Sequence, residues 1–359
     1  APRRVRPHLL GQLPADLVEH LRRSGTGLSD AEARRLLAQT FDPPTAPPPK
    51  QPLSKLKQAA VARDFDSHRL ELLERIENPS DGFVKYLFRS PDGALSEAVR
   101  IPLEKPGRFS VCLSSQVGCA MQCAFCATGR LGLTRNLETW EMISAFLTVR
   151  DQAKGRIVGA LFQGQGEPLQ NYENVIRAAR LLSHPCGGRV SGRSITISTV
   201  GLVPQIRRFA AERHPYRLII SLTSAIAERR QRLLPVAGRV PLEELAAAVR
   251  EYWSGAKHGR LTLAMVLLGG VNTDAAEVEQ IQRLFGAMDL RINLIDVNDA
   301  RPGGFAPASD AERRAFMDAL QILKAPIVRR YSGGAETHAA CGMLAAARID
   351  ATAADRGLG

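Results

Sequence analysis

The 359-residue sequence has few aromatic residues, few cysteines and no long apolar run. Aromatic side chains make up only 5% of the chain, so recognition of nucleic acid would rely more on shape and phosphates than on stacking. The longest apolar run, LTLAMVLLGGV from Leu261, is too short to span a bilayer about 30 Å thick. The basic N-terminus APRRVRPHLL lacks a following apolar stretch and does not resemble a secretory signal. We therefore expect no membrane association.

The six cysteines are too few and too clustered for the disulfide framework of a secreted protein. In a reducing compartment such a cluster binds metal or carries out chemistry, so we expect a cytoplasmic protein. The formal net charge of +12 and the pI of about 9.9 favour a polyanionic partner such as nucleic acid. The same charge could simply maintain solubility, and composition alone leaves both interpretations open.

Residues 1–75 show helical patterns at PADLVEHLRR and SDAEARRLLAQT, and Ser29 or Asp30 can cap the second helix. We interpret this region as a helical accessory domain. The proline-rich stretch DPPTAPPPKQP (42–52) predicts a linker or loop. In region 76–107, two β-like runs flank the turn sequence SPDG and predict a hairpin.

From residue 108 to 345 strand and helix patterns alternate, which predicts a parallel sheet with right-handed crossovers. The fold class is therefore α/β, an open or partial (β/α)6 barrel that follows the helical domain and the hairpin. Ligands of such folds bind at the carboxyl ends of the strands. Residues 346–359 are expected to form a tail. The predicted strands are 108–114, 156–164, 193–199, 216–222, 260–268, 291–297 and 325–332.

Three of the six cysteines lie within CAMQCAFC, at Cys119, Cys123 and Cys126, directly after the first barrel strand. Three thiolates on a short loop suit a [4Fe-4S] cluster better than tetrahedral zinc, which needs a fourth ligand nearby. A cluster held by three cysteines leaves one iron open to a small molecule. A zinc loop that lacks one ligand and a chance group of buried thiols are the alternatives.

This motif resembles the signature of the radical-SAM superfamily. Together with TRNLETWE, GQGEPLQNYENV and HAACGML, in that order, CLSSQVGCAMQCAFCATG resembles the RlmN/Cfr family of radical-SAM RNA methyltransferases. The resemblance runs from about Glu97 to Leu344, roughly two thirds of the chain. It implies a [4Fe-4S] cluster on Cys119, Cys123 and Cys126 whose open iron binds S-adenosylmethionine. One-electron reduction then cleaves this molecule to a 5′-deoxyadenosyl radical, and a flavodoxin-type donor is the expected reductant.

The resemblance also implies a methyl relay through two further cysteines. Cys341 matches the cysteine that one S-adenosylmethionine methylates, and a second gives the radical that takes a hydrogen from this methyl. The resulting carbon radical adds to adenine C2 or C8 in RNA, with ribosomal RNA as the expected target and transfer RNA also possible. Cys112 matches the thiol that assists release through a transient disulfide, and Glu97 matches the catalytic proton acceptor. Two buried small hydrophobes and a solvated glutamate are the alternatives.

Positions that match the S-adenosylmethionine contacts of the family follow the predicted strands. Their place at strand ends agrees with the independent expectation for a barrel. Glu167 of the sequence GEP could accept a hydrogen bond from an ammonium group. The full set is Gly166, Glu167, Ser198, Ser221, Leu222, Thr223 and Asn298.

Several stretches depart from the family pattern. Gln163 and Gln165 replace two methionines, Thr223 replaces a histidine, and the segment 331–338 also differs. We therefore interpret the chain as a divergent member, which puts the RNA, the nucleotide and the carbon in doubt. We expect a monomer whose basic residues, including Arg130 and Arg135, follow RNA phosphates. A radical-SAM enzyme acting on a peptide or small metabolite and a non-catalytic iron–sulfur RNA-binding protein remain open.

Overall fold

The structure is a computed structural model and describes residues 6–255, 261–299 and 301–330. A helical module comes first, with its own core of leucines, Ala33, Ala60 and Phe65. Its helices begin where the sequence predicts, because Ser29 caps α2 and forms a capping box with Glu32. The proline-rich stretch forms no regular element and joins α2 to α3. The helices are α1 (Pro14–Arg23), α2 (Asp30–Phe41) and α3 (Lys55–Asp64).

The described strands form one ten-stranded sheet and a separate two-stranded sheet. In the large sheet β1, β2, β3 and β4 are antiparallel neighbours, whereas β4 to β12 pair in parallel. The order along the sheet is β1 (Glu71–Glu77), β2 (Val84–Arg89), β3 (Leu95–Pro102), β4 (Arg108–Leu113), β7 (Arg156–Phe162), β8 (Ile195–Thr199), β9 (Arg217–Ser221), β10 (Leu261–Leu267), β11 (Leu290–Asp296) and β12 (Ile327–Arg330).

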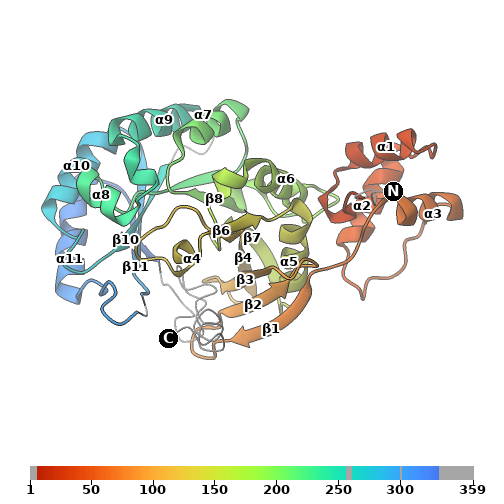
Figure 1. Cartoon of the computed structure of the whole chain (residues 1–359), viewed down its shortest axis with the longest axis horizontal. Coiled ribbons are helices and arrows are strands. Elements are labelled where there is room, and N and C mark those ends of the chain that lie inside the picture. The colour runs from red at the N-terminus through yellow and green to blue at the C-terminus, as the bar shows by residue number, and fades with distance from the viewer. Residues whose placement is uncertain (1–5, 256–260, 300, 331–359) are drawn as a thin grey trace.

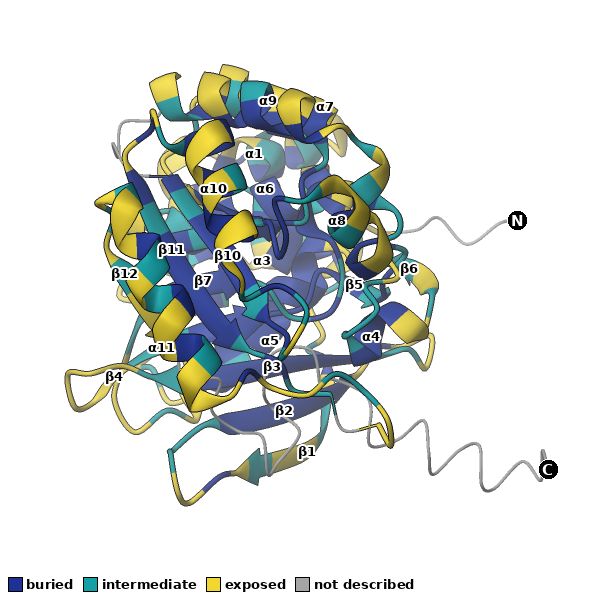
Figure 2. Cartoon of the chain, turned by 90° about the vertical axis from the view of Figure 1, so that its left-hand side faces the viewer, coloured by how far each residue is buried: buried dark blue, intermediate teal, exposed yellow. Residues whose placement is uncertain are grey.

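Helices cover the outer face of the parallel strands and seal the main core against it (Figures 1 and 2). Their apolar faces are buried and their polar faces point outward, as amphipathic periodicity requires. The α/β fold with an open parallel barrel is confirmed. The helices are α5 (Thr139–Asp151), α6 (Tyr172–Ser183), α7 (Val203–Glu212), α8 (Ala227–Leu233), α9 (Leu242–Gly255), α10 (Ala275–Phe285) and α11 (Asp310–Ala319).

The predicted hairpin is present as β2 and β3, but it is part of a longer antiparallel extension. Strand β1 adds to its outer edge and crosses the expected boundary at residue 75, which therefore falls inside a strand. The sequence LELLERIE has apolar residues at spacings that suit a helix as well as a strand, and cross-strand pairing to β2 decides for the strand.

The helical module packs against α5 and α6 through a few specific contacts (Figure 1). The His8 ring stacks on the Trp140 indole at 4.3 Å between centroids. The Nε of Arg177 donates a 2.7 Å hydrogen bond to the carbonyl of Gly11. Burial, together with the nearby His68, lowers the pKa of His8 to about 4, so this ring is neutral at physiological pH. The module is thus joined to the barrel by this neutral aromatic stack and by Arg177, which also forms an ion pair with Asp16.

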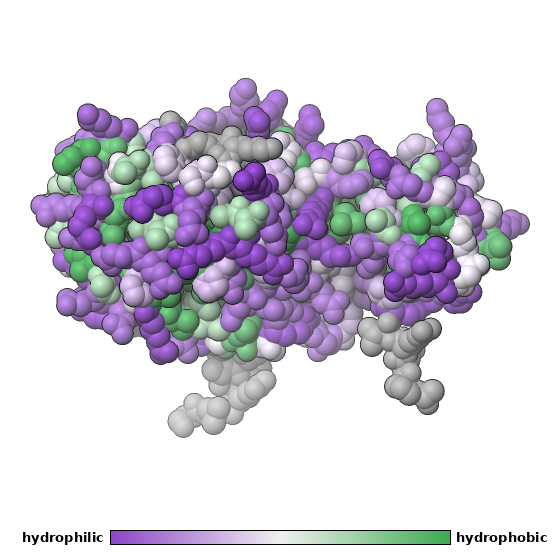
Figure 3. All heavy atoms as spheres, turned by 90° about the horizontal axis from the view of Figure 1, so that it is seen from above, coloured by the Kyte–Doolittle hydropathy of each residue, from purple (hydrophilic) through white to green (hydrophobic). Residues whose placement is uncertain are grey.

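One face of the molecule, seen in Figure 3, is mostly hydrophilic and carries its apolar residues in small separate patches. No helix of the described part is long and apolar enough to cross a membrane.

Candidate active site

The cysteine loop is held by a small hairpin that the sequence did not predict. Strand β5 (Gln116–Gly118) pairs with β6 (Leu133–Asn136), and the loop with the three cysteines runs between them. The Cys119 N–H donates to the carbonyl of Gly132 at 2.8 Å. Gly118, at φ +76°, lets the two strands approach so closely that a Cβ here would lie 1.9 Å from the Gly132 oxygen. The hairpin therefore fixes both ends of the loop.

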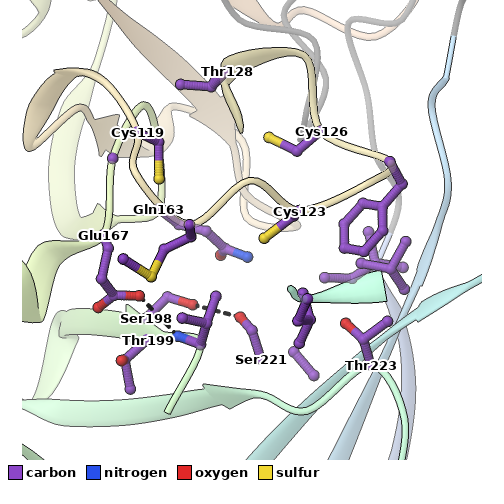
Figure 4. A pocket seen from close by; sticks show the side chains of 18 of the residues that line it. Cys119, Cys123, Cys126, Thr128, Gln163, Glu167, Ser198, Thr199, Ser221 and Thr223 are labelled. Atoms are coloured by element: carbon purple, nitrogen blue, oxygen red, sulfur yellow. Dashed lines mark hydrogen bonds between the residues drawn. The ribbon is translucent and has the colours of Figure 1, made fainter. Parts of the chain in front are cut away.

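The middle of the loop is fastened from two other elements. The Ala124 N–H donates to the Leu233 carbonyl at the end of α8 (2.9 Å), and the Arg301 guanidinium donates to the Ala124 carbonyl (2.8 Å). Gly129 allows the chain to fold back, since a Cβ there would lie 3.0 Å from the Cys123 nitrogen. As a result the three sulfur atoms face one common space (Figure 4).

The environment of the thiols suits a bound metal cluster. Burial raises the pKa of Cys119 to about 11, and burial also raises the pKa of Cys126. Hydrogen bonds from the backbone of Gly129 and Thr128 to the Cys126 thiolate act in the opposite direction. Buried thiols of this kind are protonated when alone and become thiolates when iron binds them.

Within the described ranges, no three Cys, His, Asp or Glu side chains are grouped to hold a single metal ion. A [4Fe-4S] cube is larger than one ion, so its three thiolates stand further apart. Three thiols that face one common space are a donor set suited to such a cluster.

The thiols open onto a cavity at the carboxyl ends of the parallel strands, the position that a barrel predicts for its ligands. Its empty space, counted together with the solvent at its mouth, is about 1000 Å³. Several predicted cofactor residues lie on its wall with the three cysteines, namely Gly166, Glu167, Ser198, Ser221, Thr223 and Asn298. Leu222 does not, because its side chain is buried in the main core and only its backbone lies near.

Glu167 is buried and firmly oriented at the end of the turn after β7. Its carboxylate accepts hydrogen bonds from the Leu169 and Val200 N–H groups, both at 2.9 Å. Its own N–H donates to the Gln116 side chain at 2.8 Å. Burial raises the pKa of Glu167 to about 7, against these backbone hydrogen bonds. A carboxylate held in this way is prepared to receive a cationic group.

The turn between β7 and Glu167 requires glycine at two positions. A Cβ on Gly164 would lie 2.8 Å from the backbone of Leu113, and one on Gly166 would lie 2.6 Å from the Gln116 side chain. Gly166 also has φ +100°, which other residues rarely adopt. These contacts are the physical reason for the sequence GQGEP in this turn.

Two hydroxyl groups from neighbouring strands meet on the cavity floor. The Ser198 and Ser221 oxygens are 3.1 Å apart (Figure 4). Next to them Thr223 has φ +56°, which for a β-branched residue costs about 1–2 kcal/mol. Its carbonyl accepts a 2.8 Å hydrogen bond from Asn272, which helps to hold this conformation. Strain of this kind is typical of ligand-binding turns.

The predicted relay residues Glu97 and Cys112 lie on adjacent strands, away from the wall of this cavity. Cys112 pairs with Val99 across β3 and β4, and Glu97 is on the same face two residues away. Both side chains are buried. The Lys85 ammonium lies 3.5 Å from the Glu97 carboxylate, as a buried ion pair. Cys341 lies outside the residues that the structure describes.

Sequence reasoning missed several residues at the site, above all Arg230. This arginine is 1% exposed and donates to the Val200 and Leu222 carbonyls. In the sequence ERRQRLLP it looks like one of several charges on an exposed helix face, so no local signal distinguishes it. Thr128 and Asp296 line the cavity itself. The only signals in the sequence were that Thr128 follows the cysteine motif and that Asp296 ends a predicted strand.

The profile of the Radical SAM superfamily matches residues 113–284. A probable RNA methyltransferase of Myxococcus xanthus is 48% identical over 80% of this chain and 79% of its own length. The dual-specificity RNA methyltransferase RlmN of Syntrophobacter fumaroxidans is 40% identical over 82% and 85%. The crystal structure of a radical SAM methyltransferase from Sphaerobacter thermophilus has 34% identity and a TM-score of 0.84, covering 95% of this chain and 99% of that one.

These similarities extend over the cysteine loop, the cavity and most of the sheet, and they agree with the donor set found there. The chain is an enzyme that uses a [4Fe-4S] cluster and S-adenosylmethionine, and it belongs to the RlmN/Cfr family of radical-SAM RNA methyltransferases.

Proposed function

We propose that the protein methylates an adenine carbon, C2 or C8, in RNA, with ribosomal RNA as its main target. The methyl group passes through Cys341. The observation that carries this proposal is the buried thiol of Cys112, on the strand that leads into the cysteine loop, with the Glu97 carboxylate on the same face. Among the cysteines, cleavage of S-adenosylmethionine requires only the three that hold the cluster.

A methyl relay through a cysteine allows a methylation that direct transfer from S-adenosylmethionine cannot achieve. Adenine C2 and C8 are not nucleophilic, so direct displacement of a methyl from S-adenosylmethionine would fail. A covalent thioether on the protein replaces one difficult step by easier ones. The target base must also leave its stack to reach a cavity at the strand ends, so RNA with an unpaired or extruded adenine is the expected substrate.

The bound cofactors supply the methyl group and the radical chemistry. The residues of the chain hold and release the reacting groups. We infer that Glu167, Ser198 and Ser221 orient S-adenosylmethionine on the cavity floor. Glu97 accepts the proton from adenine, and Cys112 forms a transient disulfide with Cys341 as the product leaves. Reduction then restores both thiols.

We also infer a monomer that works in the cytoplasm with a flavodoxin-type electron donor. The thiol relay and the cluster both require a reducing compartment. The names of the RNA methyltransferases from Myxococcus xanthus and Syntrophobacter fumaroxidans support RNA as the substrate class. A peptide or small metabolite as the substrate is the second possibility, and the following experiment separates the two.

The first experiment is peptide mass spectrometry of the Cys341 region after purification without oxygen. We expect one added methyl group on Cys341 in the native protein. In Cys126→Ala, which lacks a cluster ligand, Cys341 should be unmodified. Cys112→Ala should still carry the methyl, since Cys112 acts only at release. Cys186→Ala, which changes a part-buried free thiol outside the site, should match the native protein.

An unmodified Cys341 in protein that holds its cluster and cleaves S-adenosylmethionine would overturn the relay. The search would then turn to peptide and metabolite substrates.

A further inference from the structure

Arg230 is a fully buried cation behind the cavity. It lies on α8, is 1% exposed, and is the bulkiest fully buried side chain of the described residues. Placing an ionised guanidinium in the protein interior costs several kcal/mol unless an opposite charge or a full set of hydrogen bonds compensates for it. The charges and hydrogen-bond acceptors around Arg230 therefore indicate what stabilises its buried charge.

The hydrogen bonds of Arg230 are incomplete. Its Nη1 donates to the carbonyl of Leu222, and its Nη2 donates to the carbonyl of Val200 at 2.6 Å. Its Nε is buried and has no hydrogen-bond partner in the part of the chain that the structure describes. No carboxylate there forms an ion pair with it. The adjacent Arg229 differs, because Asp274 and Glu277 both pair with it.

The surroundings of Arg230 place it beside the cluster loop. The end of α8 packs on that loop, where Leu233 and Leu234 contact the apolar group that includes Cys123 and Phe125. The Leu233 carbonyl accepts the Ala124 N–H, between two of the cluster cysteines.

The charges of Arg230 and Cys123 also influence each other. Burial lowers the pKa of Arg230 to about 10, and a Cys123 thiolate acts in the opposite direction.

We propose that Arg230 is the buried counter-charge of the iron–sulfur cluster, a positioning residue that stabilises its reduced form and so raises its reduction potential. A [4Fe-4S] core held by three thiolates is an anion, and an added electron makes it more negative. A fixed cation in a medium of low dielectric constant favours the more negative state. This inference rests on the cluster and not on the RNA target, so it can fail while the proposed function stands.

Two other roles would use the same contacts. Arg230 links the backbone segments that directly follow β8 and β9 through its two hydrogen bonds. Its role could therefore be only to hold together, as a clamp, the strand ends that carry Ser198 and Ser221. It could also be the partner of the carboxylate of S-adenosylmethionine. The three roles predict different results on substitution. A clamp requires the shape of the guanidinium, whereas a counter-charge requires only its positive charge. A contact with the cofactor would instead change the affinity for S-adenosylmethionine.

The test compares cluster-loaded full-length protein, prepared without oxygen, in four forms: native, Arg230→Met, Arg230→Lys and Arg232→Met. Both changes at 230 remove the planar guanidinium fork that spans the two carbonyls, but only methionine removes the charge. Arg232 is an exposed arginine on the same helix and gives the matched control. The readouts are the cluster midpoint potential by EPR-monitored titration, the iron content, and the dissociation constant of S-adenosylmethionine.

We expect Arg230→Met to lower the ratio of reduced to oxidised cluster at a fixed potential at least tenfold, which is about 59 mV for one electron. Arg230→Lys and Arg232→Met should stay near the native potential. Equal shifts in both Arg230 variants would assign the effect to the clamp and overturn the proposal. An unchanged potential with a tenfold weaker binding of S-adenosylmethionine would overturn it in favour of the cofactor carboxylate. If Arg230→Met does not fold, a native-like potential in Arg230→Gln would contradict the proposal equally.

Discussion

Glu167 shows how a single residue at this site depends on its surroundings. In water its carboxyl group would be ionised at neutral pH, but burial raises its pKa to about 7. Two backbone N–H groups fix the orientation of the Glu167 carboxylate but do not supply a positive charge to balance it. A cationic group that enters the cavity would pull the equilibrium toward the carboxylate. Binding of such a ligand should therefore depend on pH near neutrality.

This gives a prediction for S-adenosylmethionine. Its affinity for the cluster-loaded protein should fall roughly tenfold between about pH 8 and about pH 6, because protonated Glu167 no longer attracts the ammonium group. Isothermal titration calorimetry without oxygen measures the change. Glu167→Gln should bind more weakly and lose most of the pH dependence. The same pH dependence in the glutamine variant would show that another group titrates.

At the scale of single residues, the sequence predicted those site residues that lie in distinctive local sequence motifs. The cysteine motif and the GEP turn indicated Cys119 and Glu167, and the structure places both on one cavity. Arg230 could not be predicted, because its burial depends on where α8 packs and not on its neighbours in the sequence. Thr223 likewise gave no signal of its left-handed backbone, which Asn272 and the Ala264 carbonyl hold from other elements.

Among the elements, the β5–β6 hairpin has the most direct influence on the cluster. It is only a few residues long, yet it closes the loop that carries all three ligands. Gly118 and Gly132 both have positive φ, but their surroundings differ. A Cβ on Gly118 would meet the Gly132 carbonyl, whereas a Cβ on Gly132 would meet nothing within 4 Å.

We therefore predict that Gly118→Ala opens the hairpin and weakens cluster binding, while Gly132→Ala does not. Alanine at position 132 should cost only the backbone strain of about 1–2 kcal/mol. Alanine at 118 adds a backbone clash that can be relieved only by moving a strand. Iron content after exposure to a chelator measures the effect, with circular dichroism as the check on folding. Equal iron loss in both variants would contradict this account.

The long elements could be predicted and the short ones could not, for a physical reason. The spacing of apolar residues predicts the alternation of β7, α6 and β8, and the structure has these elements as expected. Strands such as β1 and β5 are defined by their partners, β2 and β6, and have little periodicity of their own. The boundary expected at residue 75 falls inside such a strand, β1.

On the scale of the whole molecule, the net charge of +12 is spread over a barrel and an attached helical module. The cavity lies at the carboxyl ends of the strands, and the opposite end has exposed lysines of its own, Lys154 and Lys324. If RNA binding depended on total charge alone, lysines at any place would contribute equally. If the module docks RNA, its exposed lysines should matter more.

The module carries two exposed lysines for this test, Lys50 and Lys55. Each phosphate contact that is lost should reduce the slope of log affinity against log salt by about 0.7–0.9. We predict that the double alanine variant at 50 and 55 binds RNA more weakly, with a slope lower by about two such steps. The matched double variant Lys154→Ala with Lys324→Ala should retain the native slope. Cleavage of S-adenosylmethionine without RNA should be the same in both. Equal losses in the two double variants would mean that RNA responds to overall charge, and the module would then be a structural attachment and not a docking surface.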